Sequence, residues 1–308
     1  MAEDAPASIV SLIASATEIV CALGLRDRLV GVSHECDFPE DVKGLPVLSA
    51  PKMDPELPGG EIDRQVREIV AGGLSVYDIR TEELARLRPD LVVTQDQCEV
   101  CAVSLKDVEG AVAALTLRAT RICSLRPNSL EDIVEDFRRV AAAAGVPERG
   151  EKLVRSFDDR LARLGEKSAR AVRRPTVACL EWLDPLMVAG GWMPELVRIA
   201  GGEPVVVTEA ERFRKVDWET LAGADPDVIV VMPCGFAIDR TLEELKDRRT
   251  GEMLRGMRAT RAGRCFVADG SAYFNRPGPR IADSAEILAG LIHPGIFGEQ
   301  NAAQRWPG

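Results

Sequence analysis

Two stretches of the chain decide the fold: residues 84–101, LARLRPDLVVTQDQCEVC, and residues 221–236, LAGADPDVIVVMPCGF. In each, the end of a helix leads through Pro-Asp into a hydrophobic strand rich in β-branched residues. Such strands are typical of a parallel sheet that helices cover on both faces. Ligands of these sheets collect at the carboxyl ends of the strands. We therefore expect the functional site near the cysteines that follow the two strands: Cys98, Cys101 and Cys234.

Length and composition indicate a globular protein of two domains. The chain has 308 residues, 46% hydrophobic and 29% charged, which is enough for two domains that each bury a core. Its net charge of -10 disfavours binding to nucleic acid or anionic lipid, because no basic excess offsets the phosphates. No apolar run reaches the ~20 residues that span a bilayer, so we expect no membrane-embedded segment.

The N-terminus opens with acidic residues and resembles neither a secretory signal nor a lipid-attachment site. We therefore expect a cytoplasmic protein. A periplasmic or extracellular location would require that a leader had been removed.

The pattern along the chain predicts two α/β lobes and a helical connection. Apolar residues recur at helical spacing from Leu130 to about Val172, with one break at Gly-Val-Pro, residues 145–147. Strand and helix patterns alternate on either side of this region, as in Rossmann-like lobes with parallel sheets. We predict an N-terminal α/β lobe (1–128), a linking backbone helix (129–172) and a C-terminal α/β lobe (173–308).

The first lobe offers polar side chains at its strand ends. Ser15 or Thr17 is expected to cap the helix after the first strand, and the free amides of that helix end attract an anion or polar ligand. Gln95, just beyond the strand at 91–94, is a further predicted ligand contact. The strand at 29–33 leads to His34-Glu35-Cys36-Asp37. On an extended chain His34 and Cys36 point to the same side, so they can serve one site.

The eight cysteines divide into two groups. Four lie in apolar strands or on an apolar helix face and are predicted to be packing residues: Cys21, Cys123, Cys179 and Cys265. The spacing of Cys98 and Cys101 lets both sulfurs reach one ion. We predict metal ligands among His34, Cys36, Cys98, Cys101 and Cys234. For His34, a hydrogen-bonded structural imidazole is the alternative.

Aromatic and charged residues gather near the strand ends of the second lobe. The aromatic residues either form the floor of a pocket for a planar macrocycle or pack in the core. Glu181 is a base, a ligand or a cap. Arg276 can bind a carboxylate or phosphate through its forked guanidinium, whereas Arg280 is expected at the surface. The predicted ligand-binding residues of both lobes are Ser15, Thr17, Gln95, Glu181, Trp182, Trp192, Phe236, Tyr273, Phe274 and Arg276, and no catalytic residue is assigned.

Several motifs carry a resemblance to a known family. Residues 8–33, SIVSLIASATEIVCALGLRDRLVGVS, resemble the first βαβ unit of the class III substrate-binding proteins of metal-chelate importers. The resemblance covers most of residues 8–297. A leaderless, cobalamin-binding-protein-like branch of this family is the nearest, through SHECDFP, TQDQCEVCAVS, EWLDPLMVAGGWMPELVRIAGG, MPCGF and AYFNRPGPR. The resemblance implies an α/β fold of two Rossmann-like lobes joined by one long backbone helix.

Three functions are compatible with these observations, and we favour the first. It is a binding protein that holds a corrinoid, such as cobalamin, or another metal chelate in the cleft between the lobes, with an ABC-transporter permease as partner if the protein is exported. The second is a cytosolic protein whose Cys/His site holds zinc, iron or an iron-sulfur cluster. The third is a cysteine-dependent enzyme on the same fold, with His34 as the base.

Overall fold

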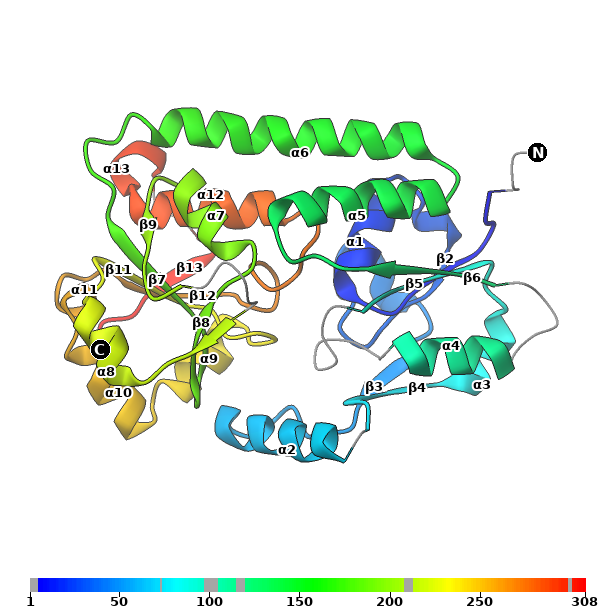
Figure 1. The fold of residues 1–308 in the computed structure, drawn as a ribbon, viewed down its shortest axis with the longest axis horizontal. Helices are drawn as coiled ribbons and strands as arrows, with labels where there is room; N and C mark the ends of the chain where they lie inside the picture. Colours follow the sequence, from blue (N-terminus) through cyan, green and yellow to red (C-terminus); the bar gives the residue numbers. More distant parts are fainter. Residues whose placement is uncertain (1–4, 73, 97–104, 115–119, 208–212, 299–300) are drawn as a thin grey trace. The chain divides into compact units, whose positions relative to one another are not determined.

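The computed structural model describes residues 5–72, 74–96, 105–114, 120–207, 213–298 and 301–308. The chain forms two compact units (Figure 1). Unit 1 comprises Met1–Leu57 and Arg64–Ser156, and unit 2 comprises Pro58–Asp63 and Phe157–Gly308. Within the described part of the chain, no helix is both long and apolar enough to cross a membrane.

Unit 1 is built on a four-stranded, fully parallel sheet in the order β2-β1-β5-β6. Its strands are β1 (Ile9–Ser11), β2 (Leu29–Gly31), β5 (Leu91–Gln95) and β6 (Arg121–Leu125). Figure 1 shows α1 (Ala14–Ala22) and α5 (Leu130–Ala143) on one face, and α3 (Thr81–Leu87) and α4 (Leu105–Ala114) on the other. All five residues of β5 are buried, which confirms the strand that its β-branched sequence predicts.

A small antiparallel ribbon accompanies this sheet. Strand β3 (Ser49–Pro51) pairs with β4 (Tyr77–Ile79), and α2 (Gly59–Ala71) lies between them in sequence. Short 3-10 turns occur at Arg26–Arg28 and Glu40–Gly44. The proline- and glycine-rich residues 44–60 predict a loop and residues 78–86 predict a helix, whereas the structure has β3 within the first range and β4 at the start of the second. Both corrections concern three-residue strands, which exist only because they pair with each other.

Two helices occupy the predicted helical connection. Helix α5 begins at a capping box, in which Ser129 Oγ accepts the backbone N–H of Asp132 and the Asp132 carboxylate accepts the backbone N–H of Ser129. After Gly145, which has a positive φ of 74°, α6 runs over Pro147–Ser168. It begins in unit 1 and ends in unit 2, so one long helix joins the two. The class III fold expected from the sequence is confirmed, while the boundaries of a separate linking segment stay a prediction.

Unit 2 contains a mixed sheet in the order β10-β8-β7-β11-β12-β13, with β9 paired to β7. Strands β7, β11 and β12 are parallel to one another, whereas β8, β10 and β13 are antiparallel additions. The strands are β7 (Thr176–Leu183), β8 (Leu186–Ala189), β9 (Glu203–Pro204), β10 (Phe213–Lys215), β11 (Val228–Val231), β12 (Cys265–Ala268) and β13 (Ala303–Arg305). The parallel core strands follow the sequence prediction.

Helices cover both faces of the unit 2 sheet (Figure 1). One face carries α7 and α12, and the other packs against α8, α9, α10 and α11 around a core that includes Ile229, Leu254 and Trp306. The helices are α7 (Met193–Ile199), α8 (Trp218–Ala224), α9 (Ile238–Glu244), α10 (Arg248–Arg255), α11 (Arg258–Arg261), α12 (Ile281–Ile292) and α13 (Pro294–Phe297).

Two details of unit 2 correct the sequence reading. The sequence pattern predicts a strand over residues 176–180, but β7 continues to Leu183 because its second half forms a hairpin with β8. The polar residues after Phe297 predict a frayed tail. Instead, β13 pairs with the edge of β12, and Trp306 is buried against the core.

Candidate functional site

The exits of the three parallel strands of unit 2 are tied together by hydrogen bonds. The backbone N–H of Cys234, after β11, donates to the carbonyl of Glu181 in β7 at 3.1 Å. Asn275, after β12, donates its side-chain N–H groups to the carbonyls of Met232 at 3.1 Å and Gly270 at 3.0 Å. The carboxyl edge of this sheet is therefore a rigid platform, at the place where ligands of parallel sheets bind.

A glycine allows the exits of β11 and β12 to approach each other. A Cβ atom on Gly270 would lie 2.2 Å from the carbonyl oxygen of Pro233 and 2.5 Å from that of Met232. Both neighbours are backbone atoms, which cannot turn aside as a flexible side chain can. Only glycine fits this position without moving the platform.

An aromatic group lies on the platform. The rings of Trp182 and Phe236 are 5.1 Å apart at 48°, and the guanidinium of Arg240 lies 4.9 Å from the Phe236 ring centre. Trp182 donates its indole N–H to the carbonyl of Asp184 at 2.9 Å, which fixes the ring. Phe236 is buried, whereas Trp182 keeps part of its surface exposed. Trp182 lies in β7, together with Glu181, and does not follow the strand as the sequence reading had it.

The loop after β12 contributes a second aromatic side chain and two arginines. Tyr273 is half-buried, and the guanidinium of Arg280 lies 5.5 Å from its ring centre. Arg276 is only 8% exposed and donates to Ser271 Oγ at 3.3 Å. Arg280, which was expected at the surface, is half-buried over Tyr273 because the ring attracts its cation.

Two other aromatic residues of the predicted set belong to the core. Phe274 is completely buried, and Trp192 is 5% exposed. The indole N–H of Trp192 donates to the backbone carbonyl of Phe274 at 3.0 Å. Of the two roles that the sequence left open, core packing fits both residues.

In unit 1, the predicted ligand contacts of the first helix lie at the carboxyl edge of the sheet. The N-cap of α1 is Ile13, with no side-chain cap, so the expectation that Ser15 or Thr17 caps this helix is wrong. Ser15 and Gln95 are almost completely buried, and Ser15 Oγ and Gln95 Nε2 have no hydrogen-bond partner among the described residues. Thr17 is also buried, and its Oγ1 lies 3.0 Å from the sulfur of Cys36.

His34 is held by the antiparallel ribbon. Its Nδ1 lies 2.8 Å from Ser49 Oγ, and its ring centre lies 5.2 Å from that of Tyr77. The residue as a whole is exposed, whereas its ring is part-buried where it meets Ser49. Desolvation of the ring is the main reason that the pKa of His34 is lowered to about 4, and the positive charge of Arg80 adds to it. The imidazole is therefore neutral at pH 7. The sequence reading missed Ser49 and Tyr77, because no local pattern indicates which strand pairs with which.

His34 and Cys36 do not share one side of an extended chain. Strand β2 ends at Gly31, and the chain turns at His34 and Glu35. Cys36 is buried, with its sulfur 3.1 Å from Ser33 Oγ in addition to its contact with Thr17. Burial raises the pKa of the Cys36 thiol above its ordinary value. This cysteine is a packed thiol and not an accessible ligand.

The predicted Cys/His metal site has no support in the described part of the chain. No group of three or more His, Cys, Asp or Glu residues there could hold a metal ion. Cys234 is exposed, and Cys98 and Cys101 lie outside the described residues. Burial raises the pKa of the four cysteines predicted to pack, to about 11 for Cys21 and Cys123 and to about 12 for Cys179 and Cys265. None of these four thiols has the lowered pKa of a nucleophile.

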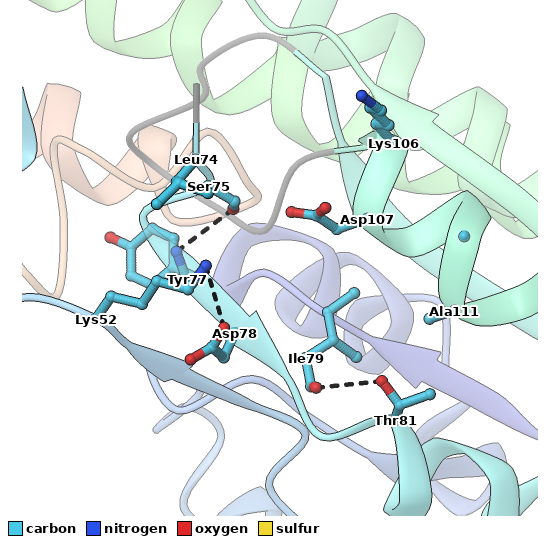
Figure 2. Close-up of a pocket in the computed structure, with 11 residues that line it drawn as sticks. Lys52, Leu74, Ser75, Tyr77, Asp78, Ile79, Thr81, Lys106, Asp107 and Ala111 are labelled. Carbon is cyan, nitrogen blue, oxygen red and sulfur yellow. Dashed lines mark hydrogen bonds and ion pairs between the residues drawn. The ribbon is translucent and has the colours of Figure 1, made fainter. Parts of the chain in front are cut away.

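A cavity of about 520 Å³ lies in unit 1 between the ribbon and α4, lined by the residues that Figure 2 shows. Its wall includes Tyr77, Lys106, Asp107 and an ion pair between Lys52 and Asp78 at 3.1 Å. The described residues that line it include none of those predicted from the sequence. Four of the eleven residues that line it are charged, whereas a typical small-molecule site is lined predominantly by apolar side chains.

Comparisons with known proteins agree with this architecture. The family model described as periplasmic binding protein matches residues 9–272. A vitamin B12-binding protein of Vibrio parahaemolyticus is 24% identical over 92% of this chain and 88% of its own length. An uncharacterized ABC transporter substrate-binding lipoprotein of Bacillus subtilis is 23% identical over 96% of this chain and 82% of its own length.

Solved structures show the same fold. A periplasmic heme binding protein from Pseudomonas aeruginosa superposes with a TM-score of 0.72 at 23% identity, over 94% of each chain. The periplasmic vitamin B12 binding protein of Vibrio cholerae gives a TM-score of 0.66 at 20% identity, over 96% of this chain and 99% of that one. Because the family model spans most of the sequence, the chain belongs to the periplasmic binding protein family.

Proposed function

We propose that this substrate-binding protein holds a metal chelate of the tetrapyrrole type. A corrinoid such as cobalamin is the first candidate, and heme is the second. The two ligands come from the names of the relatives and of the structural neighbours. An ABC-transporter permease is the corresponding partner, in line with the description of the Bacillus subtilis relative. The cytoplasmic location expected from the sequence stays a prediction.

The observation that carries the proposal is the aromatic group at the carboxyl edge of the unit 2 sheet. Trp182 and Tyr273 are both partly exposed residues there, and hydrogen bonds hold the platform that carries them. A tetrapyrrole has a broad apolar face that stacks on aromatic rings, and its rim carries amides or carboxylates that accept hydrogen bonds. Arg276 and Arg280 lie in the same loop and can neutralise carboxylates of the ligand.

Neither alternative function has an observation in its favour. A zinc, iron or iron-sulfur site lacks a set of ligands among the described residues. A cysteine-dependent enzyme would need an activated thiol and a base. The described thiols with shifted pKa values are all shifted upward, and His34 has a lowered pKa.

The test is calorimetric titration of the protein with cyanocobalamin and with hemin. We expect one of them to bind, and Trp182→Ala to weaken that binding at least about tenfold, which corresponds to about 1.4 kcal/mol. Phe297→Ala is the matched control. Phe297 is half-buried and lies in α13, which follows the C-terminal end of α12. The loop after β12 leads into the N-terminal end of α12, so Phe297 is remote from the platform and this variant should bind like the wild type. The proposal fails if neither compound binds at about 100 μM, well above the micromolar range of a specific complex.

A further inference from the structure

The first turn of α2 lies against the platform of unit 2. Residues Pro58–Asp63 belong to unit 2, whereas the rest of α2 belongs to unit 1. Gly59 is buried, and a Cβ atom at this position would lie 3.4 Å from Cζ2 and 3.5 Å from Cε2 of Trp182. The backbone of this turn therefore covers part of the indole ring. We call Pro58–Asp63 the α2 cover.

Two carboxylates of unit 2 meet the α2 cover at the amino end of the helix. A Cβ atom on Gly59 would lie 3.2 Å from Oε2 of Glu244, and one on Gly60 would lie 2.4 Å from Oδ2 of Asp184. Only glycine allows the backbone to approach both carboxylates this closely. The dipole of a helix favours negative charge at its amino end. The cover is therefore held on unit 2 by electrostatic attraction as well as by its fit.

Glu244 connects the α2 cover to the aromatic group. Its Oε2 accepts the backbone N–H of Gly59 at 3.1 Å, and its carboxylate pairs with Arg240 at 3.1 Å. The guanidinium of Arg240 lies over Phe236, whose ring is tilted against Trp182. A hydrogen bond to a carboxylate is stronger than one between neutral groups, so Glu244 anchors the cover beside the ring that it covers.

The α2 cover and a bound macrocycle need the same surface. A planar ligand stacks on an aromatic side chain only where no other atoms lie on the ring. The proposed chelate stacks on Trp182, and Gly59 already covers part of this ring. When a segment has to move before a ligand can bind, the apparent affinity falls in proportion to the fraction of molecules that are open. A contact that holds the cover in place then weakens binding.

We propose that the α2 cover is an autoinhibitory contact, which shields Trp182 in the ligand-free protein and leaves the ring when a chelate binds. This inference rests on the proposed function and adds a conformational step to it. The hydrogen bond between Gly59 and Glu244 then opposes ligand binding. Its removal strengthens binding, whereas the loss of a residue that contacts the ligand weakens it.

Two variants break this hydrogen bond from opposite sides. Gly59→Pro removes the hydrogen that Glu244 accepts, and proline is well tolerated at the first position of a helix. Glu244→Ala removes the acceptor and also breaks the pair with Arg240. An effect common to both variants therefore comes from the cover. The matched control is Glu243→Ala, because this neighbouring glutamate of α9 is exposed and pairs with Lys246 at 2.6 Å.

Acrylamide quenching of tryptophan fluorescence tests the α2 cover without any ligand. Collisional quenching requires exposure, and the three tryptophans other than Trp182 are at most 7% exposed. Their contribution is measured in Trp182→Phe and subtracted. We expect the quenching constant of Trp182 to rise at least about twofold in Gly59→Pro and Glu244→Ala, because local opening exposes the ring. Glu243→Ala should match the wild type. An unchanged constant in both test variants would overturn the proposal.

Titration with cyanocobalamin and with hemin tests the autoinhibition. We expect Gly59→Pro and Glu244→Ala to bind the ligand about tenfold more tightly than the wild type, the effect of one hydrogen bond to a charged group. Glu243→Ala should bind like the wild type. Equal or weaker binding by both test variants would overturn the inference while the proposed function stands. Tighter binding by Glu244→Ala alone would assign the effect to Arg240 and would overturn the inference as well.

The failure of the proposed function has a different signature. If neither the wild type nor the test variants bind either probe, the proposed function fails and the autoinhibition fails with it. The acrylamide experiment then decides only whether Pro58–Asp63 covers Trp182.

Discussion

Gly270→Ala is the substitution that strains the unit 2 platform most directly. The new methyl group would lie 2.2 Å from the backbone oxygen of Pro233, whereas ordinary contact begins at about 3.4 Å. The exits of β11 and β12 therefore have to separate by about 1.2 Å. Gly270 itself does not have a positive φ, so the effect is purely steric.

The loss in the free energy of unfolding caused by Gly270→Ala has two contributions. Forcing a methyl group into a packed site costs about 1–3 kcal/mol. Separating the exits also strains the two hydrogen bonds of Asn275, worth about 1 kcal/mol each. We expect a loss of about 3 kcal/mol in the free energy of unfolding of unit 2, which lowers the urea midpoint by about 1 M at an m-value near 3 kcal/mol/M.

Tryptophan fluorescence reports this transition selectively. All four tryptophans, Trp182, Trp192, Trp218 and Trp306, belong to unit 2. The matched control is Gly223→Ala in the last turn of α8, where a Cβ atom meets nothing within 4 Å. Alanine is the better helix former by about 0.5–1 kcal/mol, so this variant should raise the midpoint. A Gly270→Ala midpoint at or above that of the wild type would refute the steric argument.

Three further predictions concern α5 and the thiols. Burial outweighs Arg139 and raises the pKa of Asp136 to about 7, so the folded state holds a proton that the unfolded state releases above its ordinary pKa of 3.8. The stability of the wild type relative to Asp136→Asn should therefore be greatest below about pH 4 and decline as the pH rises through about 7, measured by urea unfolding across pH. Ser129→Ala removes one half of the capping box and should speed amide exchange in the first turn of α5 about fivefold, for a loss of about 1 kcal/mol; unchanged exchange would rule out the cap. In thiol labelling mapped by mass spectrometry, the exposed Cys234 should react faster than the buried thiols, which are Cys36, Cys123, Cys179 and Cys265. Faster labelling of a buried thiol than of Cys234 would contradict the structure.

The parts of the fold that the sequence predicted are those with a strong local signal. The β-branched runs at 91–94 and 228–232 gave the core strands, and Gly145 with Pro147 gave the break between α5 and α6. The ribbon of β3 and β4, the β8 hairpin and β13 were missed. Each is a short strand whose pairing partner is antiparallel and supplied by the tertiary structure, so its own sequence has no periodicity long enough to detect.

The site was harder to predict than the fold. Trp182 and Phe274 both stand near strand ends in the sequence, yet Trp182 is partly exposed on the platform and Phe274 is completely buried. His34 and Cys36 were paired on the assumption of an extended chain, and the turn at His34 separates them. The hydrogen-bond partner of the His34 ring is Ser49, which lies in a strand 15 residues further along the chain. Burial and cross-strand contacts of this kind depend on packing and leave no motif.

The central claim is that the aromatic platform of unit 2 binds a metal chelate. Its most direct test is quenching of tryptophan fluorescence during titration with cyanocobalamin and with hemin, compared between the wild type and Trp182→Ala. We predict saturable quenching by at least one of them at one ligand per protein, and in Trp182→Ala a ligand concentration at half-maximal quenching that is about tenfold higher. The absence of saturable quenching by either compound, or the same half-maximal concentration in both proteins, would contradict the claim.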